Sequence, residues 1–264
     1  LHQLLRTRVN DFAIKLANVN GTGSASANSL LMQAIFRMGI PVSGKNLFPS
    51  NIQGLPTWYE IRVNKEGHTA RALDYDLMIA MNSQTYARDV KEVREGGHLL
   101  YDSTWPLDPS LHREDVNFIG IPFSKMCNEA FSNSRERILM KNIAYAGALV
   151  ALLDVDMAVV EQLLDEKFAT KKALRESNTK ALKLGYDFAK ANFQCPLPFH
   201  LETMDANADK VLIDGNTATA LGCLYAGATV GAWYPITPAT DIMQTRTRST
   251  TMEELFQQYR ASRQ

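Results

Sequence analysis

The chain has 264 residues, 45% hydrophobic and 21% charged, which is typical of a soluble globular protein with room for one large domain or two smaller ones. Its 28 basic and 28 acidic residues cancel, so the net charge gives no reason to expect binding to nucleic acid or to an anionic membrane. The three cysteines are far apart and odd in number, which favours a reducing compartment and argues against a disulfide framework or a four-thiolate site. No apolar run is long enough for a signal peptide or a membrane span, so we expect a cytoplasmic protein.

The first predicted element is a strand over residues 9–19, which leads through a glycine-rich turn into a helix over residues 24–38. This order is typical of a dinucleotide-binding site. The G-x-G-x-x-G fingerprint nevertheless fails, because Ser26 stands where Gly or Ala is needed. The acidic residue expected about 20 residues further on is also missing, since Lys45 and its neighbours occupy that region. We therefore predict no NAD site.

Residues 39–46 nearly match a phosphate-binding Walker A loop, but Asn46 replaces the magnesium-binding hydroxyl and the loop follows a helix rather than a strand. These departures exclude a P-loop ATPase. A weaker hypothesis is that two loops share a phosphate-bearing ligand such as coenzyme A. The residues of this site would be Gly21, Thr22, Gly23, Ser24, Ser43 and Lys45. The alternative is that Lys45 is an ordinary solvated side chain.

The middle of the chain alternates short apolar runs with helical patterns, which predicts a three-layer α/β domain with a mostly parallel sheet. Polar clusters beginning at Asn82 and Asp102 follow two of these runs and are either ligand groups or helix N-caps. The five histidines lack metal-ligand spacing and no G-x-S-x-G elbow occurs, so we predict neither a metal site nor a serine hydrolase. We expect a functional loop over residues 47–57, a hairpin from 58–63 and 69–72, strands over 77–81, 97–101 and 116–122, and helices over 85–93, 126–154, 157–168 and 171–192.

Residues 214–243 are expected to form a helix, a short buried strand over residues 229–234 and then a turn. We expect an apolar strand over residues 211–213 to precede the helix, with Asn216 as the N-cap and Gly227 as the stop.

The turn itself has two prolines around Ile236 and Thr237. Pro235 and Pro238 prevent a strand from continuing, and Thr237 suits the N-cap of the next helix. Asp241 would then lie in the first turn of that helix. A hydroxyl beside free helix amides at the end of a strand suits an anion, although an ordinary capped turn explains the same residues.

The stretch GNTATALGCLYAGATVGAWYPITPATDIM, and above all its pentapeptide YPITP, resembles the start of the pyrimidine-binding domain of 2-oxoacid:ferredoxin oxidoreductases. The residues before it resemble the gamma domain of the same family, which is fused ahead of the pyrimidine-binding domain in many alpha subunits. The resemblance implies a gamma-type α/β domain over residues 1–195, a linker over 196–210 and the N-terminal part of a thiamine-diphosphate-type pyrimidine-binding domain over 211–264.

The resemblance also implies a reaction, in which a 2-oxoacid is oxidatively decarboxylated on thiamine diphosphate, electrons pass through an iron–sulfur cluster to ferredoxin, and the acyl group passes to coenzyme A. By matching the motif, Thr237 would hydrogen-bond the substrate's carboxylate or carbonyl group. The turn would be held near the thiazolium ring by Tyr234, Pro235, Ile236 and Pro238. A partner beta subunit would hold the diphosphate, magnesium and the cluster, so we expect a hetero-oligomer and an inactive isolated chain.

The sequence departs from the family pattern after Met243. The family's cofactor-activating glutamate and substrate-binding arginine would lie further downstream, and Glu253 and Glu254 are too close to Thr237 to replace them. The resemblance does not distinguish pyruvate from 2-oxoglutarate or from aryl and branched 2-oxoacids. The alternative from another functional class is a non-catalytic α/β module that docks a partner and binds coenzyme A.

Overall fold

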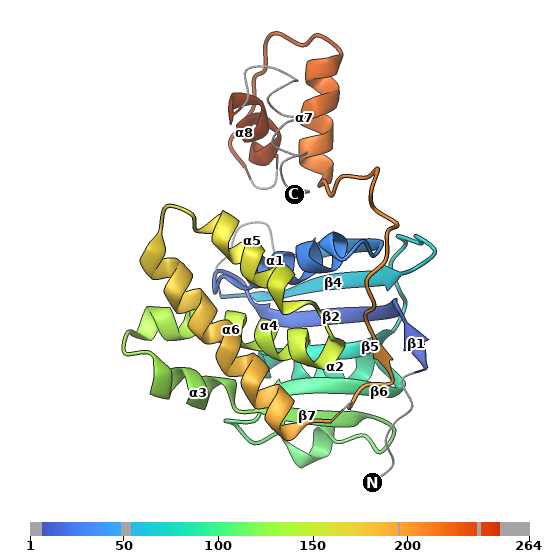
Figure 1. Ribbon diagram of the computed structural model, residues 1–264, viewed down its shortest axis with the longest axis vertical. Helices are drawn as coiled ribbons and strands as arrows, with labels where there is room; N and C mark the ends of the chain where they lie inside the picture. The colour runs from blue at the N-terminus through green and yellow to red at the C-terminus, as the bar shows by residue number, and fades with distance from the viewer. Residues whose placement is uncertain (1–6, 49–53, 195, 237–238, 249–264) are drawn as a thin grey trace. The chain divides into compact units, whose positions relative to one another are not determined.

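The structure is a computed structural model that describes residues 7–48, 54–194, 196–236 and 239–248 (Figure 1). The chain divides into two compact units, Leu1–Ala206 and Asn207–Gln264. In the described ranges, no helix combines the length and the apolar character needed to cross a membrane. The identities of the two units as a gamma domain and part of a pyrimidine-binding domain stay predictions.

The first unit contains a six-stranded sheet in the order β3-β4-β2-β5-β6-β7. Strands β2, β5, β6 and β7 are parallel, whereas β4 runs antiparallel to both β2 and β3. A small second sheet pairs β1 (Arg8–Val9) with β8 (Phe199–His200). The strands of the large sheet are β2 (Asp11–Val19), β3 (Val42–Leu47), β4 (Pro56–Asn64), β5 (Tyr75–Ala80), β6 (Val93–Asp102) and β7 (Asn117–Ile121). This mostly parallel sheet confirms the predicted fold class.

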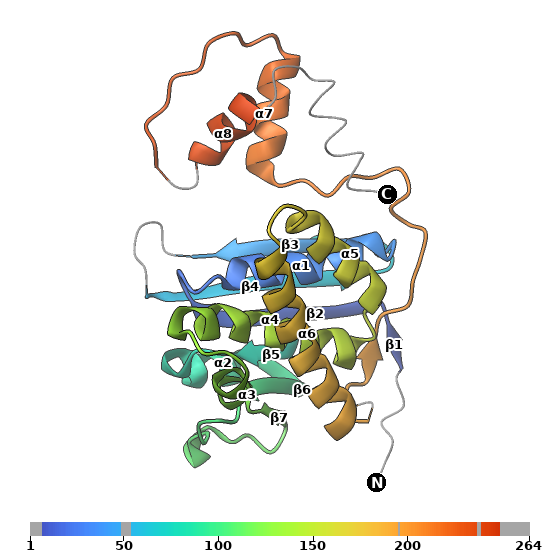
Figure 2. The same cartoon turned by 60° about the vertical axis from the view of Figure 1, so that its left-hand side comes forward.

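Helices cover the two faces of the sheet unequally, which produces the three predicted layers. One face carries the main core and most helices, which lie on the same side of the sheet in Figures 1 and 2. These helices are α1 (Ser24–Arg37), α3 (Phe123–Ala130), α4 (Ser134–Leu153), α5 (Met157–Lys167) and α6 (Lys172–Asn192). The other face carries α2 (Tyr86–Glu92), with the 3-10 turns η1 (Ser83–Thr85) and η2 (Pro109–Leu111), over a smaller core. Helix α2 packs mainly on β5 and β6 and is joined to β4 at Trp58, so no described helix covers the β3 edge of this face.

Helices α4 and α6 cross so closely that each presents a glycine at the contact. A Cβ atom added to Gly147 would lie 1.9 Å from the carbonyl oxygen of Leu182, and one added to Gly185 would lie 1.8 Å from that of Ala144. Only a glycine hydrogen fits in such a space, so the two glycines let α6 pack directly onto α4.

Two predictions for the first unit are wrong in detail. The predicted hairpin between residues 58–63 and 69–72 does not form, because residues 69–72 are an irregular loop. Strand β4 pairs instead with β3. Strand β3 begins at Val42, inside the stretch that resembled a Walker A loop. Glycine and lysine have low strand propensity, but pairing along β4 satisfies the backbone of β3.

The helical region predicted over residues 126–154 is two helices. Asn133 separates them, because its side chain accepts hydrogen bonds from the amides of Arg135 and Glu136 and so caps α4.

The second unit contains α7 (Gly215–Tyr225) and α8 (Thr240–Arg248) in its described part. The N-cap of α7 is Asp214 rather than the predicted Asn216, since the Asp214 carboxylate accepts a hydrogen bond from the amide of Thr217. Gly227, with a φ of 81°, ends this helix as predicted.

The two strands predicted in the second unit are wrong. Residues 211–213 and 229–234 are irregular, and the side chain of Val230 is exposed. A strand needs a neighbour to pair its backbone groups, and no described residue of this unit supplies one. Asp241 lies in the first turn of α8, as predicted.

Candidate functional site

The predicted substrate-binding turn is described only in part. Thr237 and Pro238, and with them the predicted N-cap and first helical position, lie outside the described residues. Pro235 is exposed, as are Tyr234 at 80% and Ile236 at 55% of their full accessible surface. The roles of all five residues stay predictions.

The glycine turn after β2 is held by bonds within the protein. Gly21 and Gly23 have φ values of 86° and 83°, which explains the glycines. The Thr22 hydroxyl donates to the carbonyl of Val19, and the Thr22 carbonyl accepts from the side-chain amide of Asn142. The neighbouring Ser24 is buried at the start of α1. This turn packs beside α4, on the helix-covered face.

The structure places Ser43 and Lys45 away from this turn. In the sheet register Lys45 is opposite Glu60 of β4, which is in turn opposite Lys15 of β2. From Lys15 to Val19 alone β2 extends roughly 13 Å at about 3.3 Å per residue, and the turn lies beyond Val19. One phosphate group therefore cannot contact both halves of the predicted phosphate site, and each half stays a prediction by itself.

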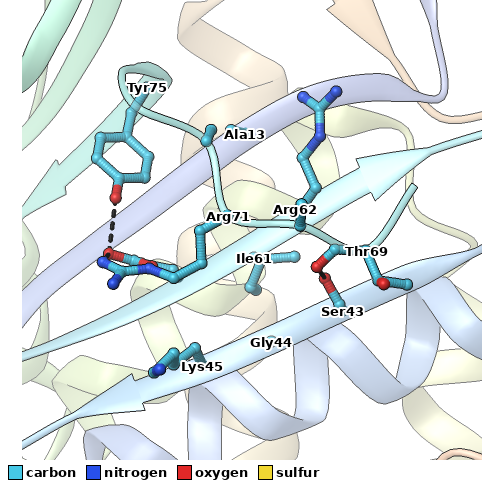
Figure 3. Close-up of a pocket in the computed structure, with 12 residues that line it drawn as sticks. Ala13, Ser43, Gly44, Lys45, Ile61, Arg62, Thr69, Arg71 and Tyr75 are labelled. Carbon is cyan, nitrogen blue, oxygen red and sulfur yellow. Dashed lines mark hydrogen bonds and ion pairs between the residues drawn. The ribbon is translucent and has the colours of Figure 1, made fainter.

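A cavity of about 300 Å³ lies where Ser43 and Lys45 are found, on the sheet face that no described helix covers at this end (Figure 3). The strands β2, β3 and β4 form its floor, and the loop of residues 65–74 forms a wall. Its lining residues are Ala13, Ser43, Gly44, Lys45, Glu60, Ile61, Arg62, Thr69, Ala70, Arg71, Ala72 and Tyr75.

Glu60 is the buried carboxylate of this cavity, with 5% of its surface exposed. Both of its oxygens accept hydrogen bonds from Arg71, at 2.5 Å and 2.6 Å, and the hydroxyl of Tyr75 donates at 2.6 Å. Burial opposes ionisation of Glu60, but the bonds from Arg71 and Tyr75 and the charges of Arg71 and Lys15 outweigh it and lower its pKa. The same ion pair raises the pKa of Arg71. Both groups therefore stay charged at neutral pH.

Lys15 lies beside Glu60, on the neighbouring strand β2 beneath the cavity. Its ammonium group is buried, lies 2.5 Å from the Glu92 carboxylate and 3.8 Å from that of Glu60, and sits 4.9 Å from the ring centre of Tyr75. The pKa of Glu92 is lowered, because bonds and charges from Lys15 and Arg88 outweigh the cost of its burial. The Lys15 charge is thus neutralised within the protein.

A second buried carboxylate, Asp89, holds α2 to β4. It accepts hydrogen bonds from the indole of Trp58 at 2.9 Å and from the hydroxyl of Thr85 at 2.6 Å. Its side chain is fully buried, and burial raises its pKa to about 6 in spite of both bonds.

The two predicted cavity residues differ in what they offer a ligand. The Ser43 hydroxyl donates to the carbonyl of Thr69 and so ties the wall loop to β3. Lys45 is exposed and forms no hydrogen bond or ion pair with any residue that the structure describes. Arg62 is paired with Asp11 at 3.1 Å and points away from Arg71 (Figure 3). Lys45 is therefore the uncommitted cation of the cavity.

Sequence reasoning missed Glu60, Arg71, Tyr75 and Lys15. One signal was present: in residues 58–63 the polar side chains alternate with apolar ones, which places Trp58, Glu60 and Arg62 on one face. Of the two polar clusters, Asn82 caps η1 by accepting a hydrogen bond from the amide of Gln84. Asp102 instead accepts bonds from the amide of Thr104 and from the amide and hydroxyl of Ser124, which ties the end of β6 to the start of α3.

The cysteines whose placement is described do not form a cluster site. Cys127 is buried in the first unit, where burial raises its pKa to about 11, and Cys223 is exposed in the second. Among the described residues no three His, Cys, Asp or Glu side chains converge on a metal position.

Comparison with known proteins assigns the chain to a protein family. Residues 13–188 match the family described as pyruvate ferredoxin/flavodoxin oxidoreductase. The alpha subunit of 2-oxoacid:ferredoxin oxidoreductase 2 from Aeropyrum pernix is 20% identical over 88% of this chain and 42% of its own. The 2-oxoglutarate oxidoreductase subunit KorA of Mycobacterium tuberculosis is 31% identical, over 39% of this chain and 17% of its own.

Solved structures show the same relationship. The 2-oxoglutarate:ferredoxin oxidoreductase of Magnetococcus marinus, solved with 2-oxoglutarate, coenzyme A and succinyl-CoA bound, superposes with a TM-score of 0.79 and 27% identity over 90% of this chain and 41% of its own. The gamma subunit of a keto/oxoacid ferredoxin oxidoreductase from Geobacter sulfurreducens shares the fold, with a TM-score of 0.54 and 20% identity over 68% of this chain and 99% of its own. The chain spans about two-fifths of the length of the curated alpha subunits it matches. It belongs to the pyruvate ferredoxin/flavodoxin oxidoreductase family.

Proposed function

We propose that this chain is part of the alpha subunit of a cytoplasmic 2-oxoacid:ferredoxin oxidoreductase. In the proposed reaction a 2-oxoacid and the thiol of coenzyme A give acyl-CoA and carbon dioxide, and two electrons pass to ferredoxin with release of a proton. The observation that carries the proposal is the superposition with the Magnetococcus marinus enzyme over 90% of this chain. The matching alpha subunits from Aeropyrum pernix and Sulfurisphaera tokodaii support it.

In the proposal the turn around Thr237 binds the 2-oxoacid. Thr237 would donate a hydrogen bond to the substrate's carboxylate or carbonyl oxygen, and the flanking Pro235 and Pro238 would restrict the turn. The exposure of Tyr234 and Ile236 is compatible with contacts to substrate or partner. Bound thiamine diphosphate would supply stabilisation of the negative charge that decarboxylation leaves on the substrate carbon.

The proposal assigns magnesium, the diphosphate site and the iron–sulfur cluster to a partner beta subunit. A cluster needs about four thiolates, whereas the described Cys127 is buried with a raised pKa. The residues described in this chain therefore do not fit a cluster. Ferredoxin would then dock near that partner, and the assembly would be a hetero-oligomer.

The test combines the chain, expressed in its complete reading frame, with the matching beta subunit, thiamine diphosphate, magnesium and coenzyme A. Reduction of methyl viologen or ferredoxin is followed with pyruvate, 2-oxoglutarate and a branched 2-oxoacid. We expect reduction that requires both coenzyme A and one of these acids. If none of the acids supports reduction by a folded assembly, the enzyme assignment fails and the non-catalytic, coenzyme A-binding module becomes the better explanation.

A Thr237→Ala variant tests the residue assignment within this assay. We expect a raised KM for the 2-oxoacid or a reduced kcat, with an unchanged circular dichroism spectrum and an unchanged KM for coenzyme A. Kinetics equal to those of the wild type would remove Thr237 from the substrate site.

A further inference from the structure

The amino-terminal edge of the large sheet carries cationic and aromatic side chains around one buried carboxylate. Asp76 of β5 is 4% exposed, and one of its oxygens accepts a hydrogen bond from the amide of Ala13 at 2.7 Å. The other oxygen lies 2.6 Å from the guanidinium group of Arg8 and 2.7 Å from that of Arg94. This edge is opposite to the one with the glycine turn, because that turn follows the carboxyl end of β2.

A bulge in β6 brings Arg94 to this carboxylate. The pairing of β5 with β6 shifts here, so that residues 94–97 of β6 lie opposite the single residue Asp76. Gly96 has a φ of 72°, a conformation that residues with a side chain rarely adopt. Because bulges redirect side chains, the extra length lets the Arg94 guanidinium reach Asp76 before the strand resumes its register at His98.

His98 is buried beside this pair of arginines. Its side chain is 2% exposed, and neither ring nitrogen has a hydrogen-bond partner within the described ranges. The Nε atom of Arg94 is likewise buried and unpaired. The His98 ring meets the Phe199 ring of β8 edge to face at 6.1 Å, and the Arg8 guanidinium lies 5.2 Å from the centre of the same Phe199 ring. A buried N–H group without an acceptor costs free energy, so an acceptor that enters here is bound favourably.

The carbonyl of Pro196 is the one protein acceptor that acts on the His98 ring, and it lies outside good hydrogen-bond geometry. This carbonyl can serve only one of the two ring nitrogens, so the other nitrogen is left for a ligand. Burial lowers the pKa of His98, the charges of Arg94 and Arg8 act in the same direction, and the Pro196 carbonyl and Asp76 oppose the shift. His98 is therefore neutral in this cationic surrounding unless a negative charge joins it.

The charges at this edge favour an anion over a water molecule. Arg8 and Arg94 share the single carboxylate of Asp76, which leaves one positive charge in excess in this group of side chains. The unpaired Nε atom of Arg94 is a donor only, whereas a water molecule also needs acceptors for its own two hydrogens. Both oxygens of Asp76 are already used. An anion needs only donors and also removes the excess charge.

We infer that the amino-terminal edge of the sheet binds one small monovalent anion, with the Nε of Arg94 and a ring nitrogen of His98 as its donors and Arg8 as a second source of positive charge. The side chains of Arg8 and Arg94 are 28% and 35% exposed, so the anion enters from solvent between them. The ligand is small, because the two nitrogens that hold it are buried. A halide ion and a short carboxylate such as formate share this chemistry. The site does not depend on the proposed function.

The test is urea unfolding of the 264-residue chain in sodium bromide and, separately, in sodium formate, with each salt raised from about 10 to about 300 mM. An anion that binds only the folded state raises the folding equilibrium constant. We expect a rise of about fivefold or more in at least one salt. A rise in bromide alone identifies a halide site, and a rise in formate identifies a carboxylate site.

The matched control is Arg175→Gln, because Arg175 pairs with Asp165 at an exposed position and its loss removes the same charge elsewhere in the first unit. This control should keep the wild-type response to salt. Arg94→Gln should lose most of the response, since one of the two donors is gone. His98→Phe should lose it as well, because it removes both ring nitrogens without changing a charged side chain and keeps a ring against Phe199.

The dependence on pH gives a readout that general salt effects do not share. A bound anion stabilises the imidazolium form of His98, so the wild-type response should grow as the pH falls from about 8 to about 6. His98→Phe should show no such growth. If His98→Phe responds to salt as the wild type does, or if all four proteins show equal rises, the salt effect reflects an adventitious ion only and the site is overturned. No rise in either salt on folded wild-type protein would overturn it as well.

Discussion

The buried carboxylate of Asp89 gives a prediction whose size follows from the structure. An Asp89→Asn change removes the charge but keeps both hydrogen bonds. The asparagine carbonyl accepts from the Trp58 indole as the carboxylate does, and its NH₂ group donates to the hydroxyl of Thr85. That hydroxyl continues to donate to the carbonyl of Asn82.

The expected gain follows from the pKa. Burial raises the pKa of Asp89 from 3.8 in the unfolded chain to about 6, and each unit corresponds to about 1.4 kcal/mol. The folded state therefore binds this proton more tightly, and the ionised carboxylate lowers the free energy of unfolding above pH 6 by up to about 3 kcal/mol. The penalty falls as the pH decreases from about 6 to 4 and is absent below both pKa values.

The assay is urea unfolding of wild type and Asp89→Asn at a series of pH values, with the difference in unfolding free energy plotted against pH. We expect the variant to be more stable by about 1–3 kcal/mol at pH 8, with the difference shrinking to near zero by about pH 3. A variant that is less stable at pH 8, or a difference that does not change with pH, would refute the reasoning.

Further predictions concern packing and charge. Gly185→Ala should lower the unfolding free energy by about 3 kcal/mol or more, because the new methyl group would overlap the Ala144 carbonyl in the α4–α6 contact. The control is Gly222→Ala in α7, where an added Cβ atom meets nothing within 4 Å. In the same urea titration the control variant should have an unchanged or a higher unfolding free energy. Glu60→Gln should cost about 2 kcal/mol at pH 7, because Arg71 and Lys15 lose their carboxylate. Because the pKa of Glu60 is lowered in the folded state, the stabilisation from its carboxylate is fully present above the unfolded pKa and is lost as the pH falls through the folded pKa. A Glu60→Gln variant with wild-type stability at pH 7 would contradict this account.

Much of the first unit was predictable, because the spacing of apolar residues along the sequence indicates which side chains of a helix or strand are buried. The strand through Ile14 and Leu16 and the helix through Ala27 and Leu31 have their apolar side chains in the core, and the structure confirms both elements. Elements that depend on a distant partner were not predictable. Strand β3 contains Gly44 and Lys45 and is a strand only because β4 pairs with it along its length. The predicted strand over residues 229–234 failed for the converse reason, since the described part of its unit contains no partner strand.

The same limit applies to the cavity. Ser43 and Lys45 were singled out because they lie in a stretch that nearly matches a Walker A loop, but their partners come from sequence positions that no local pattern connects. Arg71 and Tyr75 reach Glu60 only because an irregular loop crosses the sheet face. The sequence also suggested that the turn at Gly21 shares the phosphate, whereas the length of β2 separates the two places.

The most direct test of the account is an experimental structure of the chain, assembled with its beta subunit, in the presence of a 2-oxoacid. The account predicts that the Thr237 hydroxyl donates a hydrogen bond to the carboxylate or carbonyl oxygen of the bound acid. A 2-oxoacid bound with no contact to the turn of residues 234–238 would contradict it.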